Sequence, residues 1–260
     1  MSILDDIVED TRRRVAFERT IRPFPDVIDG SRIRPRRTGF PFSRNLEAEG
    51  MSFICEVKRA SPSKGMIAQD FPYLEIAKEY EIAGASAISC LTEPYYFQGK
   101  DMYLKEITQH VTIPVLRKDF TVDPYMIYQA RTLGASAILL ICSLLSQSEL
   151  EEYQAMATEL GMSALVEAHD EREVEMALRA EASIIGVNNR DLKTFTVDIN
   201  NSARYRKMVP KEVAFVSESG IKTAEDIAKL LENGTDAVLI GETLMRSENK
   251  KQALDELRGI

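Results

Sequence analysis

Apolar and polar positions follow a repeating order along this chain, in which short apolar runs alternate with longer amphipathic stretches. The segment 84–88 reads GASAI and recurs letter for letter at 134–138, each time after a helix-like stretch and before an apolar run. AEASIIGV at 180–187 and NGTDAVLIG at 233–241 keep the same order. A helix that ends at Gly, followed by a short buried strand and a polar loop, is the βα unit.

Eight apolar runs are predicted to be strands, at 53–58, 86–91, 113–118, 136–141, 162–167, 183–188, 213–218 and 236–240. Eight strand and helix alternations in about 210 residues predict an α/β fold, a TIM (β/α)8 barrel with an N-terminal helical extension. We expect a single domain over 1–260, with the extension at 1–48, including a helix near 2–18, and the barrel at 49–260. A doubly wound open sheet is the alternative, but no G-x-G-x-x-G follows the first strand.

Composition limits the classes of partner. The 260 residues carry a net charge of −8, which argues against general affinity for nucleic acid or an anionic membrane surface. Cys55, Cys90 and Cys142 each lie within an apolar run and are predicted to be buried thiols, as in a reducing cytosol. No apolar run is long enough for a membrane span, and the start, MSILDDIVED, is acidic, so we expect a cytoplasmic protein.

The segment 11–44 is an exception to this acidic balance, because it holds ten Arg against Glu18, Asp26 and Asp29. A nucleic-acid-binding arm is one interpretation. The other is an ordered extension packed on the barrel, which the Pro and Phe residues between the arginines favour.

Charged and polar residues gather at the carboxyl ends of the predicted strands, where TIM barrels carry their active sites. They are Glu56 and Lys58, Lys118, Glu167, Asn188 with Arg190 after it, Glu218 with Ser219 and Gly220, and Gly241 with Glu242. Structural ion pairs are the alternative interpretation. Buried charges cost several kcal/mol each unless paired, so a purely structural set of this size is the less economical explanation.

Two glycine-containing loops, SESGI and LIGETL, follow the seventh and eighth strands, where barrels commonly hold a phosphate. SPSKG after the first strand can add the Ser61 hydroxyl and a lysine, unless it is only a surface turn. His110 and His169 are interpreted as ordinary helix-end and loop residues, and we expect no metal site. Proton transfer then falls to lysine and glutamate, whose pKa values burial and neighbouring charges can shift.

Seven motifs resemble those of the indole-3-glycerol-phosphate synthase family, in order and at the right spacing across about residues 50 to 246. They are EVKRASPSKG, LTEPYYFQG, PVLRKDF, VEAHD, GVNNRDL, VSESGI and LIGETLMR. The N-terminal extension is similar to that of the family as well. The resemblance implies a TIM-barrel lyase without cofactor, which converts 1-(2-carboxyphenylamino)-1-deoxyribulose 5-phosphate to indole-3-glycerol phosphate, carbon dioxide and water in tryptophan biosynthesis.

The resemblance also implies roles for single residues. Lys118 is the general acid of ring closure, and Glu167 transfers protons later with Lys58 and Glu56. Lys58 is also placed to hold the substrate carboxylate, and whether it acts as an acid stays open. The remaining implied residues contact the substrate. Asn188 and Arg190 orient the anthranilate end, and Phe97, Phe120 and Leu192 pack against its ring. The phosphate is held by Ser61, Gly220, Gly241 and the backbone N–H of Glu242, and the other substrate-binding residues are Glu218, Ser219 and Leu239.

Two departures from the family pattern are small: Pro94 precedes Phe97, and Glu242 stands where some relatives carry Ser. The alternatives are phosphoribosylanthranilate isomerase or another phosphosugar barrel, a non-catalytic sugar-phosphate binding module, and an RNA-binding role for the extension. We expect a monomer that binds a small phosphorylated substrate, without nucleic acid or membrane.

Overall fold

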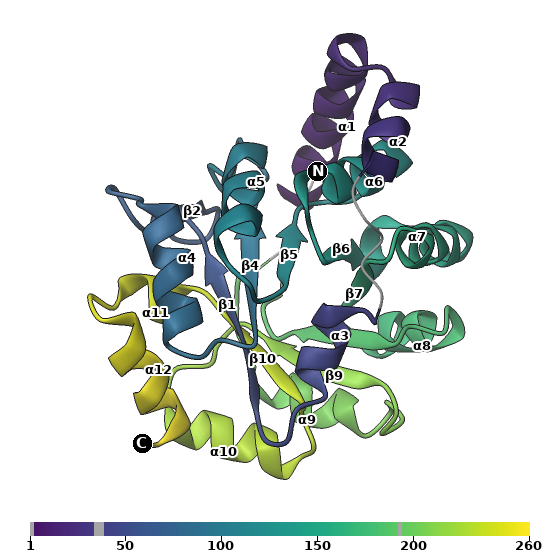
Figure 1. Cartoon of the computed structure of the whole chain (residues 1–260). Coiled ribbons are helices and arrows are strands. Elements are labelled where there is room, and N and C mark those ends of the chain that lie inside the picture. Colours follow the sequence, from purple (N-terminus) through teal and green to yellow (C-terminus); the bar gives the residue numbers. More distant parts are fainter. Residues whose placement is uncertain (1–2, 34–38, 192–193) are drawn as a thin grey trace.

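Eight parallel strands close into a barrel in the computed structural model, which describes residues 3–33, 39–191 and 194–260 (Figure 1). The strands are β1 (Ser52–Val57), β4 (Ala87–Leu91), β5 (Val115–Lys118), β6 (Ala137–Ile141), β7 (Ser163–Ala168), β8 (Ile184–Asn188), β9 (Ala214–Glu218) and β10 (Ala237–Ile240). Strand β1 pairs with both β4 and β10, so the sheet has no edge. The predicted barrel is confirmed, and the open doubly wound sheet is excluded.

Helices surround the strands (Figure 1). They are α4 (Tyr73–Ile82), α5 (Asp101–His110), α6 (Pro124–Leu133), α7 (Gln147–Glu159), α8 (Glu171–Arg179), α9 (Asn200–Arg206), α10 (Ala224–Glu232), α11 (Glu242–Arg246) and α12 (Lys250–Arg258), with a 3-10 turn η1 (Cys142–Leu144) and a small hairpin of β2 (Ala60–Ser61) and β3 (Gly65–Met66). The expected helix end at Gly is present, since Gly134 ends α6 at φ 96°, and Ser146 and Glu149 form a capping box on α7.

The alternation along β1 separates two cores. Phe53, Cys55 and Val57 face outward and pack among the helices, whereas Ile54 faces the barrel interior with Leu116 and the inner residues of other strands. Both cores are mainly apolar; a buried exception is Arg117 of β5, which pairs with Asp101 at 2.9 Å. The three cysteines are free and buried, as predicted.

The N-terminal extension is helical and packs on the side of the barrel. Helices α1 (Ile3–Ile21) and α2 (Phe24–Ile33) lie beside α6 (Figure 1). Arg14 forms an ion pair with Asp119 at 2.8 Å, and Arg19 forms one with Asp123 at 2.5 Å. These contacts support the ordered-extension interpretation for the described arginines; Arg34, Arg36 and Arg37 lie outside the described residues.

The third helix of the extension, α3 (Pro41–Leu46), closes one end of the barrel (Figure 1). Its Phe42 and Leu46 are buried against the first residues of several strands, including Ala87 and Ala237. The barrel is therefore filled at the amino ends of its strands, and its polar residues lie at the opposite end. No helix among the described residues is long and apolar enough to span a membrane.

Candidate active site

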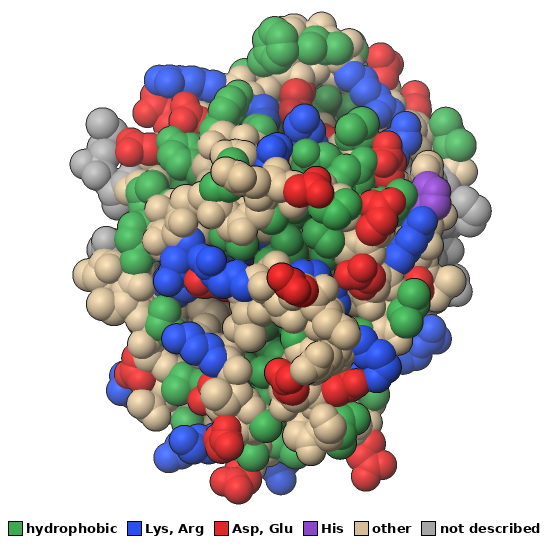
Figure 2. Space-filling view, turned by 90° about the vertical axis from the view of Figure 1, so that its left-hand side faces the viewer, with side chains coloured by type: hydrophobic (Ala, Val, Ile, Leu, Met, Phe, Trp, Pro, Cys, Tyr) green, Lys and Arg blue, Asp and Glu red, His purple; other side chains and the backbone are tan. Residues whose placement is uncertain are grey.

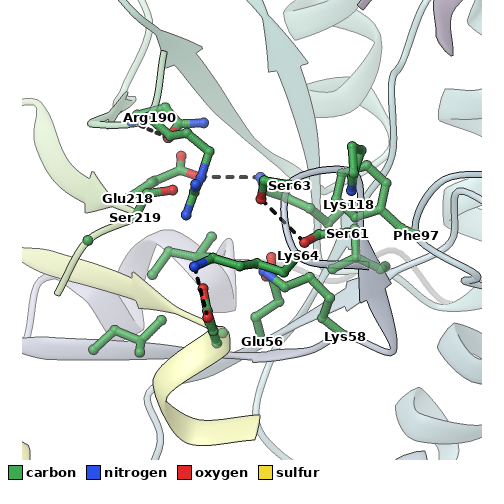
Figure 3. Close-up of a pocket in the computed structure, with 18 of the residues that line it drawn as sticks. Glu56, Lys58, Ser61, Ser63, Lys64, Phe97, Lys118, Arg190, Glu218 and Ser219 are labelled. Carbon is green, nitrogen blue, oxygen red and sulfur yellow. Dashed lines mark hydrogen bonds and ion pairs between the residues drawn. The ribbon is translucent and has the colours of Figure 1, made fainter. Parts of the chain in front are cut away.

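A cavity of about 750 Å³ opens at the carboxyl ends of the strands, where side chains from several strands and loops converge (Figure 3). Every residue predicted for the site lines it except Leu192, which lies outside the described residues. The lining residues that the sequence predicted are Glu56, Lys58, Ser61, Phe97, Lys118, Phe120, Glu167, Asn188, Arg190, Glu218, Ser219, Gly220, Leu239, Gly241 and Glu242. Their individual roles stay predictions.

Lys118, the last residue of β5, lies between two carboxylates. Its Nζ is 3.2 Å from Glu167 Oε2 and 3.3 Å from Glu218 Oε2. Burial alone would lower the pKa of Lys118, but Glu167, Glu218 and then Glu56 raise it above its ordinary value. Lys118 is therefore positively charged, and it lines the cavity.

Glu56 and Lys58 form a second buried pair, in which the Lys58 ammonium lies 2.5 Å from Glu56 Oε1. Burial would raise the pKa of Glu56, but Lys58 and Lys118 lower it below its ordinary value. Gly241 makes room for this pair. A Cβ at that position would lie 2.5 Å from Glu56 Oε1 and 2.9 Å from Lys58 Nζ, so any larger residue would displace one of them.

Glu218, at the end of β9, is the third carboxylate of the cluster. Burial raises its pKa to about 8, and the neighbouring charge of Glu167 adds to that rise. Its Oε1 is buried without a hydrogen-bond partner among the described residues. With Glu218 protonated near neutral pH, the charges of Glu56 and Glu167 balance those of Lys58 and Lys118, which lowers the cost of burying them together.

Glu167 is the most highly connected of these carboxylates. Besides Lys118, its contacts include Asn188, whose Nδ2 donates to Oε1 at 3.2 Å, and His169, whose Nε2 lies 3.2 Å from the same oxygen. Burial would raise the pKa of Glu167, but Lys118 and then His169 hold it well below its ordinary value. The sequence interpretation of His169 as an ordinary loop residue missed this contact. The signal was present, because Glu173 follows four residues later at the start of a helix.

Two aromatic rings form one wall of the cavity. The centroids of Phe97 and Phe120 are 6.0 Å apart, with their planes inclined by 42°. The Glu93 carboxylate fixes the loop that carries Phe97 by accepting from the backbone N–H groups of Tyr95, Tyr96 and Phe97. A flat apolar wall beside charged groups suits a planar ring with a carboxylate.

The loops after β1, β9 and β10 contribute further residues to the cavity lining. Ser219 and Gly220 both have positive φ, 68° and 88°, so the chain turns sharply into the cavity directly after β9. Lys64 in the β2–β3 hairpin lies 3.5 Å from the Glu242 carboxylate of α11, and Figure 3 shows Lys64 reaching across to that helix. Arg246 holds the same carboxylate at 3.2 Å, so the negative charge of Glu242 is compensated.

Helix α1 contributes a lining that the sequence interpretation missed. Ile3, Leu4 and Ile7 border the cavity, and their spacing places them on one face of the helix. Tyr96 OH donates to Asp10 at 2.9 Å and ties α1 to the loop that carries Phe97. The extension is therefore part of the cavity wall.

A closed barrel whose mouth holds paired lysines and glutamates beside an aromatic wall defines an α/β-barrel enzyme. The family model for indole-3-glycerol phosphate synthase matches residues 4–257. The chain belongs to the indole-3-glycerol phosphate synthase family.

Proteins with similar sequences match this chain over nearly its whole length. The indole-3-glycerol phosphate synthase of Ruminiclostridium cellulolyticum is 53% identical over 257 residues, which cover 99% of both chains. That of Lacticaseibacillus paracasei is 52% identical over 97% of both chains. That of Endomicrobium trichonymphae is 52% identical over 98% of this chain and 99% of its own.

Distant solved structures share only the fold. Thiamine phosphate pyrophosphorylase from Pyrococcus furiosus superposes with a TM-score of 0.62 at 15% identity, over 84% of this chain and 96% of its own. A chain of the tryptophan synthase α2β2 complex from Pyrococcus furiosus gives a TM-score of 0.61 at 16% identity, over 80% of this chain and 98% of its own.

Proposed function

We propose that this chain acts as an indole-3-glycerol-phosphate synthase through the residues at the barrel mouth. The substrate is 1-(2-carboxyphenylamino)-1-deoxyribulose 5-phosphate, and the products are indole-3-glycerol phosphate, carbon dioxide and water. The observation that carries the assignment of residues is the position of Lys118, between two carboxylates and at the floor of the cavity.

In ring closure, the arene carbon that bears the carboxylate attacks the ketone carbon of the ribulose chain. The ketone oxygen gains negative charge as the bond forms, and the Lys118 ammonium donates a proton to it. The carboxylate then leaves as carbon dioxide, and its electron pair restores the aromatic ring. This step needs no oxidant, which is consistent with an enzyme that has no cofactor.

Dehydration requires a base to remove a proton and an acid to protonate the departing hydroxyl. Glu167 is ionised and suits the base of this step. It lies 3.2 Å from Lys118 Nζ, so it can pass the abstracted proton to Lys118, which gave up its own proton in ring closure and now protonates the departing hydroxyl. A proton from solvent then returns Lys118 to its charged form. Glu56 holds Lys58 at 2.5 Å, where its ammonium can bind the substrate carboxylate before that carboxylate leaves.

Substrate binding divides between the aromatic wall and the loops after β1, β9 and β10. Phe97 and Phe120 suit the anthranilate ring, with Asn188 and Arg190 at its polar end. Ser61 and the turn at Ser219 and Gly220 suit the phosphate, with the backbone of Gly241 and Glu242. Leu192 remains a proposed ring contact, and Leu239 also lines the cavity.

We further propose a cytoplasmic monomer that binds neither nucleic acid nor membrane. Arg14 and Arg19 are engaged by barrel carboxylates, which leaves less of the extension for phosphates of RNA. On the face shown in Figure 2, acidic, basic and hydrophobic side chains are interspersed, without one sign of charge covering the face.

The test is to add the anthranilate-derived ribulose phosphate and follow indole absorbance and fluorescence, with phosphoribosylanthranilate as the competing substrate. We expect indole formation from the first compound and no isomerisation of the second. Binding of the first compound without indole formation would indicate a non-catalytic binding module. Isomerisation of the second would favour the other phosphosugar barrel. RNA affinity that falls steeply with salt would restore the nucleic-acid interpretation of the extension.

A further inference from the structure

We propose that His169 is a positioning residue for Glu167, and that Glu173 orients its imidazole for this task. The inference rests on the proposed function, because it concerns how the carboxylate of dehydration is held. It concerns three side chains in contact, Glu167 of β7, His169 and Glu173 of helix α8.

The three side chains are joined by short contacts. Glu173 Oε2 accepts from the backbone N–H of His169 at 2.8 Å and lies 3.0 Å from its Nδ1. This double attachment fixes the plane of the ring. On the other side, Nε2 lies 3.2 Å from Glu167 Oε1, without the alignment of a hydrogen bond, so this contact is an ion pair.

His169 acts from behind the site. Among the described residues, Glu167 and Asn188 line the cavity, whereas His169 does not. Asn188 and His169 both approach Oε1 of Glu167, and Lys118 approaches Oε2. The Glu167 carboxylate is thus held through both oxygens, and the imidazole takes the side that is turned away from the substrate.

The surrounding charges keep the imidazole protonated. Burial alone would lower the pKa of His169, but Glu167 and Glu173 raise it to about 10. Burial, together with the nearby charges of Glu173, Glu167 and Asp170, raises the pKa of the Cys142 thiol in η1 to about 12. The thiol therefore stays neutral over the pH range in which His169 is charged. A permanent cation behind Glu167 opposes protonation of that carboxylate while protons move between it and Lys118.

The test compares His169→Asn with His169→Gln. The Asn amide is placed to retain the contact with Glu173 but is too short to reach Glu167, whereas Gln places a neutral donor near the position of Nε2. We expect kcat of His169→Asn to fall on the order of ten- to hundredfold with KM within about twofold, the cost of misplacing a catalytic group. The acid limb of its kcat profile should move up by roughly one pH unit or more, because Glu167 has lost a cation. His169→Gln should recover most of kcat and keep the shifted limb.

The matched control is His110→Asn, which changes the only other histidine of the sequence, at the end of α5. It should leave kcat and both the acid and the basic limb of the kcat–pH profile unchanged. If His169→Asn does not fold, Glu173→Gln is the second variant: it keeps an acceptor for the imidazole but removes the charge that orients it, and it should lower kcat with KM unchanged. Its acid limb should not move up, because His169 is still protonated there and a negative charge near Glu167 has been removed. Nitrogen NMR of the imidazole in the wild-type protein supplies a readout without substrate, and a ring that is neutral at pH 7.5 would overturn the proposal.

The outcomes separate this inference from the function. A His169→Asn enzyme with kcat and acid limb equal to wild type would overturn the positioning role and leave the synthase function intact. A change confined to KM would overturn it too. Wild-type protein that forms no indole would remove the function itself, whatever the NMR titration shows.

Discussion

Replacing Lys118 with Met tests the chemistry most directly, because the two side chains have similar length and only one carries a proton. General acid catalysis contributes about 10²- to 10⁴-fold, which corresponds to about 2.7 to 5.4 kcal/mol of transition-state stabilisation. We therefore expect kcat/KM for indole formation, followed by fluorescence, to fall at least about a hundredfold.

The same change should also affect stability. Removing one partner of a buried ion pair costs about 3 to 5 kcal/mol. The Glu218 pKa of about 8 means that this carboxyl is largely protonated at neutral pH, so Glu167 is the main charge that loses a partner, and it keeps His169 at 3.2 Å. We expect the loss in unfolding free energy to lie near the lower end of that range in urea titrations at pH 7. It should shrink toward pH 5, because Glu167 can then take up a proton in the folded state.

The control is Lys105→Met, at an exposed position of α5, which should match wild type in both measurements. The activities of wild type and both variants are to be compared at a temperature at which circular dichroism shows that Lys118→Met is folded. A folded Lys118→Met enzyme that retains more than a tenth of wild-type kcat/KM would refute the general-acid role.

Three further changes have expected outcomes. Arg14→Met should cost about 1.5 to 3 kcal/mol of unfolding free energy in urea, because the buried Asp119 carboxylate loses its partner at 2.8 Å but keeps Arg117 at 3.5 Å and Thr92 at 2.6 Å; a loss below about 0.5 kcal/mol would contradict this. Gly241→Ala should reduce activity by more than tenfold while the fold persists, since the new Cβ would lie 2.5 Å from Glu56 Oε1, and unchanged kinetics would show that the pair can shift freely. Glu218→Gln should flatten the pH dependence of stability. The pKa of Glu218 is about 8 in the folded state and about 4.3 in the unfolded state, so wild type loses stability as pH rises between these values, by at most about 1.4 kcal/mol per pH unit. Equal slopes of stability against pH for both proteins would refute the raised pKa.

The sequence predicted the barrel well because strand alternation and helix stop signals are local. The repeated GASAI marks the helix end at Gly134 and the entry into β6. The same reasoning brought the charged strand ends to one cavity, since parallel strands in a barrel end on one side. Helices α2 and α3 of the extension were not anticipated.

Features that depend on contacts between distant residues were beyond the sequence patterns. The role of α1 in the cavity wall requires knowing that Arg14 meets Asp119 and that Tyr96 meets Asp10. The link between His169 and Glu167 has a local signal, but only the closed barrel shows that the ring turns toward the carboxylate. The ion pair between Lys64 and Glu242 likewise links the first and last loops of the barrel, which are far apart in the sequence.

The anchors of helix α1 have a consequence for synthesis of the chain on the ribosome. Arg14 finds its partner 105 residues later in the sequence, and Arg19 finds its partner 104 residues later. At about 5 to 20 residues per second, α1 waits roughly 5 to 20 s before its docking surface exists. Throughout that interval Ile7 and Val15, which end up buried, remain available to chaperones or to other chains. The first helix made is thus secured only after nearly half of the chain has been synthesised.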